Sequence, residues 1–140
     1  MDLNECLRSG MVKKTMVDED LIKSLIKLSN TKEKIINNSQ MEGEGASVSV
    51  SLAYDSLREV LEAFCILHSY KVLSHICMGE LLKTLMPDFD YDRFNRYRWI
   101  RNSINYYGKI VDAKQGKELI TKILEMKRKT IETYLKKYTP

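Results

Sequence analysis

Arginine and aromatic residues interleave in one segment of this 140-residue chain, from residue 93 to residue 108. The cationic residues of the segment and its edge are Arg93, Arg96, Arg98, Arg101 and Lys109. The aromatic residues that accompany them toward its end are Trp99, Tyr106 and Tyr107. Guanidinium groups bind phosphate in a forked geometry, and aromatic rings stack on bases. The segment therefore predicts a binding surface for single-stranded RNA or a nucleotide.

A purely structural role fits the same segment. Its apolar positions recur at the three- and four-residue spacing of a buried helical face, and they are Phe94, Tyr97, Ile100, Ile104 and Tyr107. Its arginines also have acidic neighbours with which they could pair locally, namely Asp88, Asp90 and Asp92. On the residues alone, both interpretations stay open.

Other kinds of reactive site are not indicated. The chain has no phosphate-cradling glycine loop, no GxSxG elbow and no HExxH pair. The cysteines and histidines that lie near one another in the sequence are Cys65, His68, His75 and Cys77. Their spacing fits no usual zinc site, so we expect core or helix-end roles, with no metal and no cofactor. Glu59 and Glu62 lie beside Arg58, and we expect them to face solvent as ion-pair partners.

The bulk composition indicates an ordinary globular protein. The formal net charge of +4 is mild, but the cations concentrate in the second half of the chain, which makes anionic partners plausible. The apolar runs are too short to cross a membrane, and the first residues do not resemble a secretory signal, so we expect a cytoplasmic protein. Accordingly, we expect Cys6, Cys65 and Cys77 to be reduced thiols.

Amphipathic spacing and helix-capping residues predict helices over residues 3–8, 17–40, 47–70, 74–86, 91–107 and 113–137, with a loop around 37–46. In the second helix, the predicted core face is Leu21, Leu25, Leu28 and Ile35, widened by Ile22, Ile26 and Ile36. The predicted fold class is all-α, an antiparallel up-and-down four-helix bundle with additional short helices. Residues 1–16 are expected to form a short arm and residues 17–140 a single domain.

The segment that begins at Arg101 resembles the signature of the HEPN family of helical bundles. In that signature an arginine, usually followed by a polar residue, precedes a histidine by four to six positions. Here Arg101 and Asn102 are followed by Tyr106 at the helix end. The likeness extends to residues 53–63 (AYDSLREVLEA), residues 68–75 (HSYKVLSH) and residues 6–14 (CLRSGMVKK), so it covers most of the chain.

The resemblance implies a four-helix core that forms a homodimer, with two copies of the motif facing one cleft. It also implies RNA or nucleotide binding, and for many members metal-independent ribonuclease activity as toxins that pair with a nucleotidyltransferase. In that scheme Arg101 stabilises the phosphate, Asn102 orients it, and a histidine moves the proton of the attacking 2′-hydroxyl.

This chain departs from the family pattern at the histidine, because Tyr106 occupies that position. An unperturbed tyrosine has a pKa of about 10, whereas histidine titrates near neutral pH. Losing acid–base assistance typically removes about 10² to 10⁴ of rate. The first hypothesis is therefore a catalytically weak or inactive binding module that uses Arg101, Asn102 and Tyr106. An active ribonuclease toxin and a pure protein-interaction bundle are the alternatives.

Overall fold

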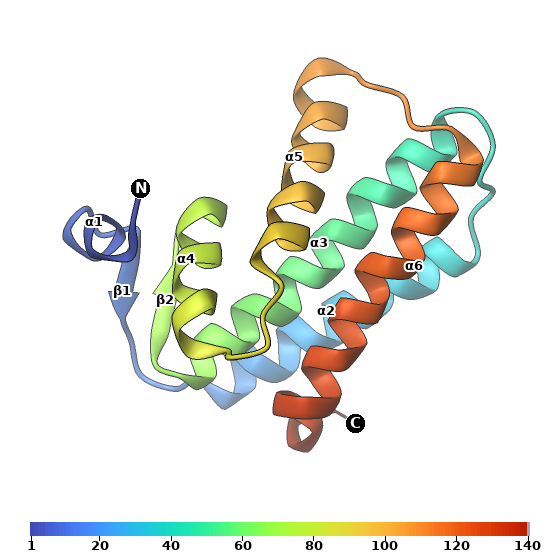
Figure 1. Ribbon diagram of the computed structural model, residues 1–140. Helices are drawn as coiled ribbons and strands as arrows, with labels where there is room; N and C mark the ends of the chain where they lie inside the picture. Colours follow the sequence, from blue (N-terminus) through green and yellow to red (C-terminus); the bar gives the residue numbers. More distant parts are fainter. Residues whose placement is uncertain (140) are drawn as a thin grey trace.

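The computed structural model describes residues 1–139 and is mainly helical (Figure 1). The long helices are α2 (Glu19–Asn37), α3 (Glu44–Leu67), α5 (Tyr91–Tyr107) and α6 (Ala113–Thr130). The short helices are α1 (Leu3–Arg8) and α4 (His75–Leu85), and the two strands are β1 (Val12–Lys14) and β2 (Tyr70–Val72). After α6 the chain continues through a π-helical turn (Ile131–Leu135) and a 3₁₀ turn (Lys136–Tyr138). The predicted all-α class is confirmed.

The helix ends follow the capping residues that the sequence contains. Asp18, Ser74, Asp90 and Asp112 each precede a helix and accept a hydrogen bond from a backbone N–H of its first turn. Gly108 ends α5 in the left-handed conformation, with φ 64°. Because such caps satisfy N–H groups that have no partner within the helix, they make these boundaries readable from the sequence.

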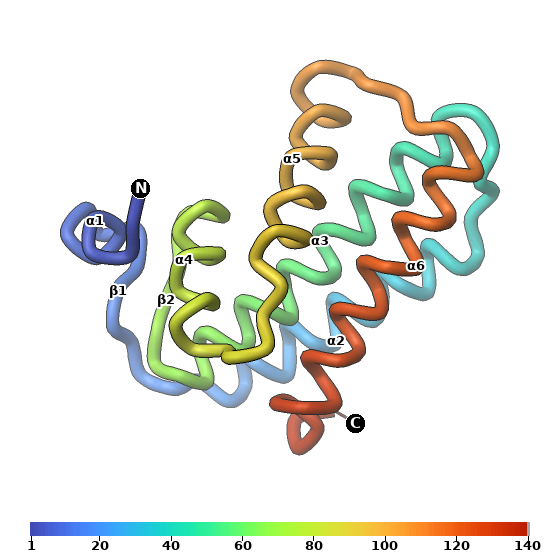
Figure 2. The backbone as a smooth tube through the Cα atoms, viewed as in Figure 1, coloured from blue at the N-terminus to red at the C-terminus, as the bar shows by residue number. Residues whose placement is uncertain are grey.

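Helix α3 lies in the middle of the molecule, with α2, α5 and α6 around it (Figures 1 and 2). Helix α5 runs antiparallel to α3, because Asn105 is hydrogen-bonded to Ser51 while Arg101 pairs with Asp55. Helix α6 runs in the same direction as α3. Near the start of both helices, a Cβ added to Gly116 would lie 3.2 Å from the Cβ of Ala46. A side chain there would therefore force Ala46 and its neighbours to shift by a few tenths of an ångström.

The core is built around α3, which is buried on several sides. Leu57, Val60, Leu61 and Phe64 are all fully buried, as their spacing predicts. Burying one such side chain contributes about 1.5–3 kcal/mol relative to leaving it exposed. Near the end of α3 the ring of Tyr134 packs edge-on against Phe64, with centroids 5.0 Å apart. This core holds α3 rigidly as the platform on which α5 lies.

The prediction for α2 placed the wrong stripe of residues at the centre of its buried face. Leu21, Leu28 and Ile35 are exposed, at 37%, 49% and 54%, whereas the residues expected only to widen the face, Ile22, Ile26 and Ile36, are buried. Both sets obey the helical period, so periodicity alone could not choose between adjacent stripes. The stripe that packs against α3 is the one that contains Ser29, whose hydroxyl donates a 2.7 Å hydrogen bond to the Ser56 carbonyl.

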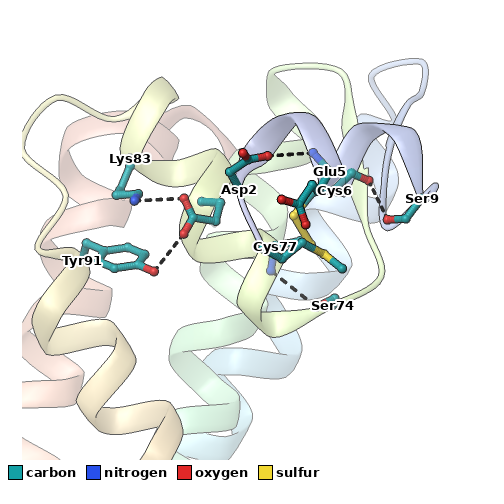
Figure 3. The surroundings of a disulfide bond; sticks show 10 residues. Asp2, Glu5, Cys6, Ser9, Ser74, Cys77, Lys83 and Tyr91 are labelled. Atoms are coloured by element: carbon teal, nitrogen blue, oxygen red, sulfur yellow. Dashed lines mark hydrogen bonds and ion pairs between the residues drawn. A yellow bond between two sulfur atoms is a disulfide. The ribbon is translucent and has the colours of Figure 1, made fainter.

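Two of the three cysteines form a disulfide, so the prediction of three reduced thiols is wrong. Cys6 of α1 is bonded to Cys77 of α4, with Cα atoms 5.7 Å apart (Figure 3). Among residues 1–139, Cys65, which is buried in α3, is the only free thiol. The bonded cysteines are 71 positions apart in the sequence, and neither local spacing nor composition signals their contact.

The N-terminal arm is further attached by a two-stranded antiparallel sheet that the sequence did not predict. Strand β1 pairs with β2 in a register that aligns Val12 with Val72 and Lys14 with Tyr70. Both valines are buried in the core. Three-residue strands carry too little pattern to be recognised before the arm and the end of α3 meet.

The expectation that Glu59 faces solvent is also wrong. Its side chain is 2% exposed, and its carboxylate lies 2.9 Å from the ammonium group of Lys32 on α2. Glu62 is partly buried and pairs with Arg58 and Lys71 at 2.9 Å each, so its predicted role as an ion-pair partner is confirmed. Along residues 1–139, no helix combines the length and apolar character needed to cross a membrane.

Candidate functional site

The residues predicted as one binding surface are divided between opposite sides of α5. Arg98 and Arg101 lie on the side that faces α3 and α4. Arg93, Arg96 and Lys109 line a pocket on the side that faces α6. The division follows from helical geometry, because residues three, four and seven apart share a face. The arginine-rich segment therefore contains two separate candidate sites.

On the first side, side chains from three helices form what we call the arginine cluster. It comprises Tyr54, Asp55 and Arg58 from α3, His75 from α4, and Arg98 and Arg101 from α5. A guanidinium nitrogen of Arg101 (Nη2) lies 3.5 Å from Asp55 Oδ1, and both side chains are partly buried. Next to this pair, Ser51 Oγ donates a 3.0 Å hydrogen bond to Asn105 Oδ1.

Two guanidinium donors of the arginine cluster are buried without a partner. Within the described part of the chain, neither Arg98 Nε nor Arg101 Nε donates a hydrogen bond. Leaving a buried donor unsatisfied costs about 1–3 kcal/mol, and more for a charged group. Asp55 pairs with Arg101, and Glu62 pairs with Arg58 at 2.9 Å. No carboxylate pairs with Arg98 among residues 1–139, so the cluster carries excess positive charge.

His75 belongs to this cluster although the sequence indicated only a helix-end role for it. Its Nδ1 is hydrogen-bonded to the Tyr54 hydroxyl at 3.0 Å, and the two rings lie against each other. Burial lowers the pKa of His75, and the nearby charges of Arg58 and Arg101 lower it further. Burial raises the pKa of Tyr54, so its hydroxyl stays protonated. A neutral imidazole therefore lies beside cationic side chains.

The three residues predicted to act together differ in their exposure to solvent. Asn102 is partly buried and accepts a 3.5 Å hydrogen bond from Arg101 Nη1. Tyr106 is 71% exposed. Tyr107 is 84% exposed, so it does not lie on the buried face that the purely structural interpretation gave it. The last turn of α5 ends at Gly108, and there the two tyrosines face solvent rather than core.

On the other side of α5, a pocket of about 430 Å³ lies between α5 and the start of α6. Arg93, Arg96, Lys109 and Lys122 supply its cationic side chains. The ammonium group of Lys109 lies 5.3 Å from the ring centroid of Trp99, which also lines the pocket. A larger groove of about 840 Å³ along α2 is lined mainly by lysines and amides, and it contains none of the predicted site residues.

The residues weighed as zinc ligands do not come together. Among residues 1–139, no three side chains of histidine, cysteine, aspartate or glutamate are grouped as metal ligands would be. Cys77 is engaged in the disulfide, Cys65 is buried, and His75 is paired with Tyr54.

The other histidine, His68, lies at the end of α3, where its Nδ1 is 3.0 Å from the Phe64 carbonyl. Its imidazole packs on the Phe64 ring, with centroids 4.4 Å apart, and its side chain is exposed. None of the charged residues that shift the pKa of His75 lies on this last turn of α3. The two histidines of the chain therefore occupy different environments: His75 lies near arginines, and His68 lies on the Phe64 ring.

Comparison with known proteins leaves the chain's family open. No protein-family model, no curated protein and no solved structure matches the chain.

Proposed function

We propose that this protein is a HEPN-like module that binds single-stranded RNA, with the arginine cluster contacting the phosphates. The proposal rests on the resemblance of residues 101–106 to the family signature and on the arrangement of the side chains around Arg101. The observation that carries it is the pair of buried Nε–H donors of Arg98 and Arg101, which have no partner among the described residues.

A phosphate suits these two donors better than a protein group does. Arg98 and Arg101 are three residues apart on α5, so their guanidinium groups extend from neighbouring positions on one face. A phosphodiester carries one negative charge and presents several acceptor oxygens. Charge-assisted hydrogen bonds of this kind contribute about 1.5–3 kcal/mol each. A bound phosphate would therefore relieve the unsatisfied donors and the excess positive charge together.

The test is a titration of short single-stranded RNA by fluorescence polarisation at several salt concentrations. We expect Arg98→Ala and Arg101→Ala each to weaken binding about tenfold or more and to reduce the salt slope by about 0.7 per lost phosphate contact. Arg128→Ala is the matched control, because it removes the same charge from an exposed pair with Glu33 on another surface. Unchanged affinity of both cluster variants over the whole salt series would refute the proposal.

The position of His75 favours metal-independent RNA cleavage as a second candidate function. In this reaction a 2′-oxygen attacks the adjacent phosphorus and the bond to the 5′-oxygen breaks. The leaving 5′-oxygen takes a proton from water, so the products are a 2′,3′-cyclic phosphate and a 5′-hydroxyl. With its Nδ1 proton donated to the Tyr54 oxygen, the imidazole would accept the 2′-hydroxyl proton at Nε2. In the family signature, a histidine at the position of Tyr106 moves this proton. Here His75 of α4 would take that role.

The two histidines of the chain provide the test of cleavage. Purified protein is incubated with RNA in EDTA, and the ends of the products are identified. We expect His75→Gln to slow cleavage about 10²-fold or more, whereas His68→Gln, at an exposed position, leaves the rate unchanged. Cleavage that persists in His75→Gln at the original rate, or that gives other ends, would remove this candidate.

We also propose a homodimer, because the resemblance implies one and α2 presents an apolar stripe to solvent. Leu21, Leu28 and Ile35 recur every seven residues along that helix and are exposed. Sedimentation of the wild type and of Leu28→Glu tests this, with a dimer that the variant dissociates as the expected result. A wild type that sediments as a monomer at all concentrations would exclude the homodimer.

A further inference from the structure

We propose that the pocket between α5 and α6, which we call the Trp99 pocket, binds a mononucleotide, with the base on Trp99 and the phosphates at Arg96 and Lys122. This surface lies on the opposite side of α5 from the arginine cluster, so the inference does not depend on the proposed function. The ligand class follows from two features of the pocket: its charge and its aromatic wall.

The charge of the pocket is strongly positive. Four cationic side chains line it, against the single carboxylate of Glu118. Arg93 is partly neutralised by Asp90, whose carboxylate oxygen lies 3.3 Å from Arg93 Nε. Within the described residues, Arg96 and Lys122 take part in no ion pair. These two side chains are therefore open to an anion with more than one charge, as a polyphosphate has.

The aromatic and apolar part of the pocket suits a base. Trp99 is 60% exposed, which is unusual for so large an apolar side chain and indicates a surface that can be covered. Lys109 lies over the ring, and Ile100 and Leu119 contribute apolar lining. Stacking of a base on an aromatic side chain contributes about 1–3 kcal/mol. The volume of about 430 Å³ is within the usual range for small-molecule sites.

The backbone keeps this pocket open. Helix α6 packs on α3, and α5 packs on α3 and α4, so a hollow is left between α5 and α6. Gly108 turns the chain in the left-handed conformation, and Lys109 is then directed back over Trp99. The next loop is held by the N–H of Val111, which donates a 2.8 Å hydrogen bond to Ser47 Oγ. The pocket walls are therefore formed before any ligand binds.

A second hollow adjoins the Trp99 pocket. This hollow of about 260 Å³ shares Arg93 and Lys122 with the pocket. Its other charged residues are Asp88, Asp90, Glu125 and Lys129, and Lys129 lies 3.4 Å from Asp88. The carboxylates of this hollow are therefore balanced by cations. The cations at the junction suit the terminal phosphates of a nucleotide whose base lies on Trp99.

The chain contains a single tryptophan, so its fluorescence reports on this pocket directly. ATP is titrated into the full-length protein, with adenosine and tripolyphosphate as partial ligands and a short single-stranded RNA as the alternative source of a nucleotide. We expect saturable quenching by ATP, weaker binding of both partial ligands, and competition by RNA only at much higher concentration. ATP that does not quench, or that binds no better than tripolyphosphate, would overturn the inference.

Variants separate this site from the arginine cluster. We expect Arg96→Ala and Lys122→Ala each to weaken ATP binding about tenfold or more. Arg128→Ala is the matched control, because it removes the same charge from a pair with Glu33 outside the pocket, and it should leave ATP binding unchanged. Wild-type ATP affinity in both pocket variants would refute the site. If Arg96→Ala weakens ATP binding but Arg101→Ala leaves RNA binding unchanged, the nucleotide site is supported and the RNA proposal fails. If Arg101→Ala weakens RNA binding but Arg96→Ala leaves ATP binding unchanged, only the nucleotide site is refuted.

Discussion

Removing the disulfide should destabilise the whole fold by an amount that follows from its place in the chain. Cys6 and Cys77 close a loop with a sequence separation of 71 residues. Constraining a loop of that length in the unfolded chain is worth roughly 4 kcal/mol by the loop-entropy relation. For a chain of 140 residues, that free energy corresponds to a fall in Tm of roughly 14 °C.

The assay is thermal and urea unfolding of the oxidised protein, of the reduced protein and of a Cys6→Ser, Cys77→Ser double variant. Reductant should lower the stability of the wild type to that of the double variant and should not change the double variant itself. Thiol alkylation after denaturation provides an independent check, because the oxidised chain should react once, at Cys65, and the reduced chain three times.

A fall in Tm below about 3 °C would refute this reasoning. It would mean that the arm carrying Cys6 separates from the bundle without unfolding it. The structure argues against such independence, because Cys6 is fully buried and β1 is paired with β2. Three reactive thiols in the untreated protein would refute the disulfide itself.

Three further predictions concern single side chains. Because the folded-state pKa of His75 is lowered, the unfolded chain binds its proton first as the pH falls below about 6.5. The free energy of unfolding of the wild type should therefore fall between pH 7 and pH 5 by more than that of His75→Gln. Urea melts in which both proteins change equally with pH would contradict this. Lys127→Ala should lower the free energy of unfolding by about 2–4 kcal/mol, because this buried side chain joins α6 to Glu33 and Ser29 of α2. Lys127→Met should lower it by less. Urea melts that place Lys127→Ala within about 1 kcal/mol of the wild type would show that the contact is weak. Gly108→Ala should lower the free energy of unfolding by about 1 kcal/mol, because φ at this position is 64°. The added Cβ meets no atom within 4 Å, so backbone strain is the only cost. A Tm equal to that of the wild type would count against this prediction.

Much of the helical architecture could be predicted because its signals are local. Helix α1 and helix α5 have the predicted bounds, and Ser74 caps α4 as expected. Capping and glycine termination act over a few residues, so they can be read without knowledge of the fold. The face of α2 could not be predicted, because Leu28 and Ile26 belong to adjacent stripes of equal period and only contact with α3 distinguishes them.

The arginines that the candidate sites need could be identified from composition, but their grouping could not. Arg96 and Arg98 are two residues apart in the sequence, yet they belong to different sides of α5. His75 could not have been assigned to the arginine cluster, because it reaches Tyr54 only when α4 packs beside α3.

The sequence by itself determined the all-α class, most helix ends and the concentration of cations on α5, since these depend on local capping, helical period and residue type. The tertiary structure alone decided the Cys6–Cys77 bond, the burial of Glu59 and the division of the arginine segment into two sites. Each of these depends on which helices come into contact. Long-range contacts of that kind are selected by the packing of the entire core, and no short stretch of sequence contains them.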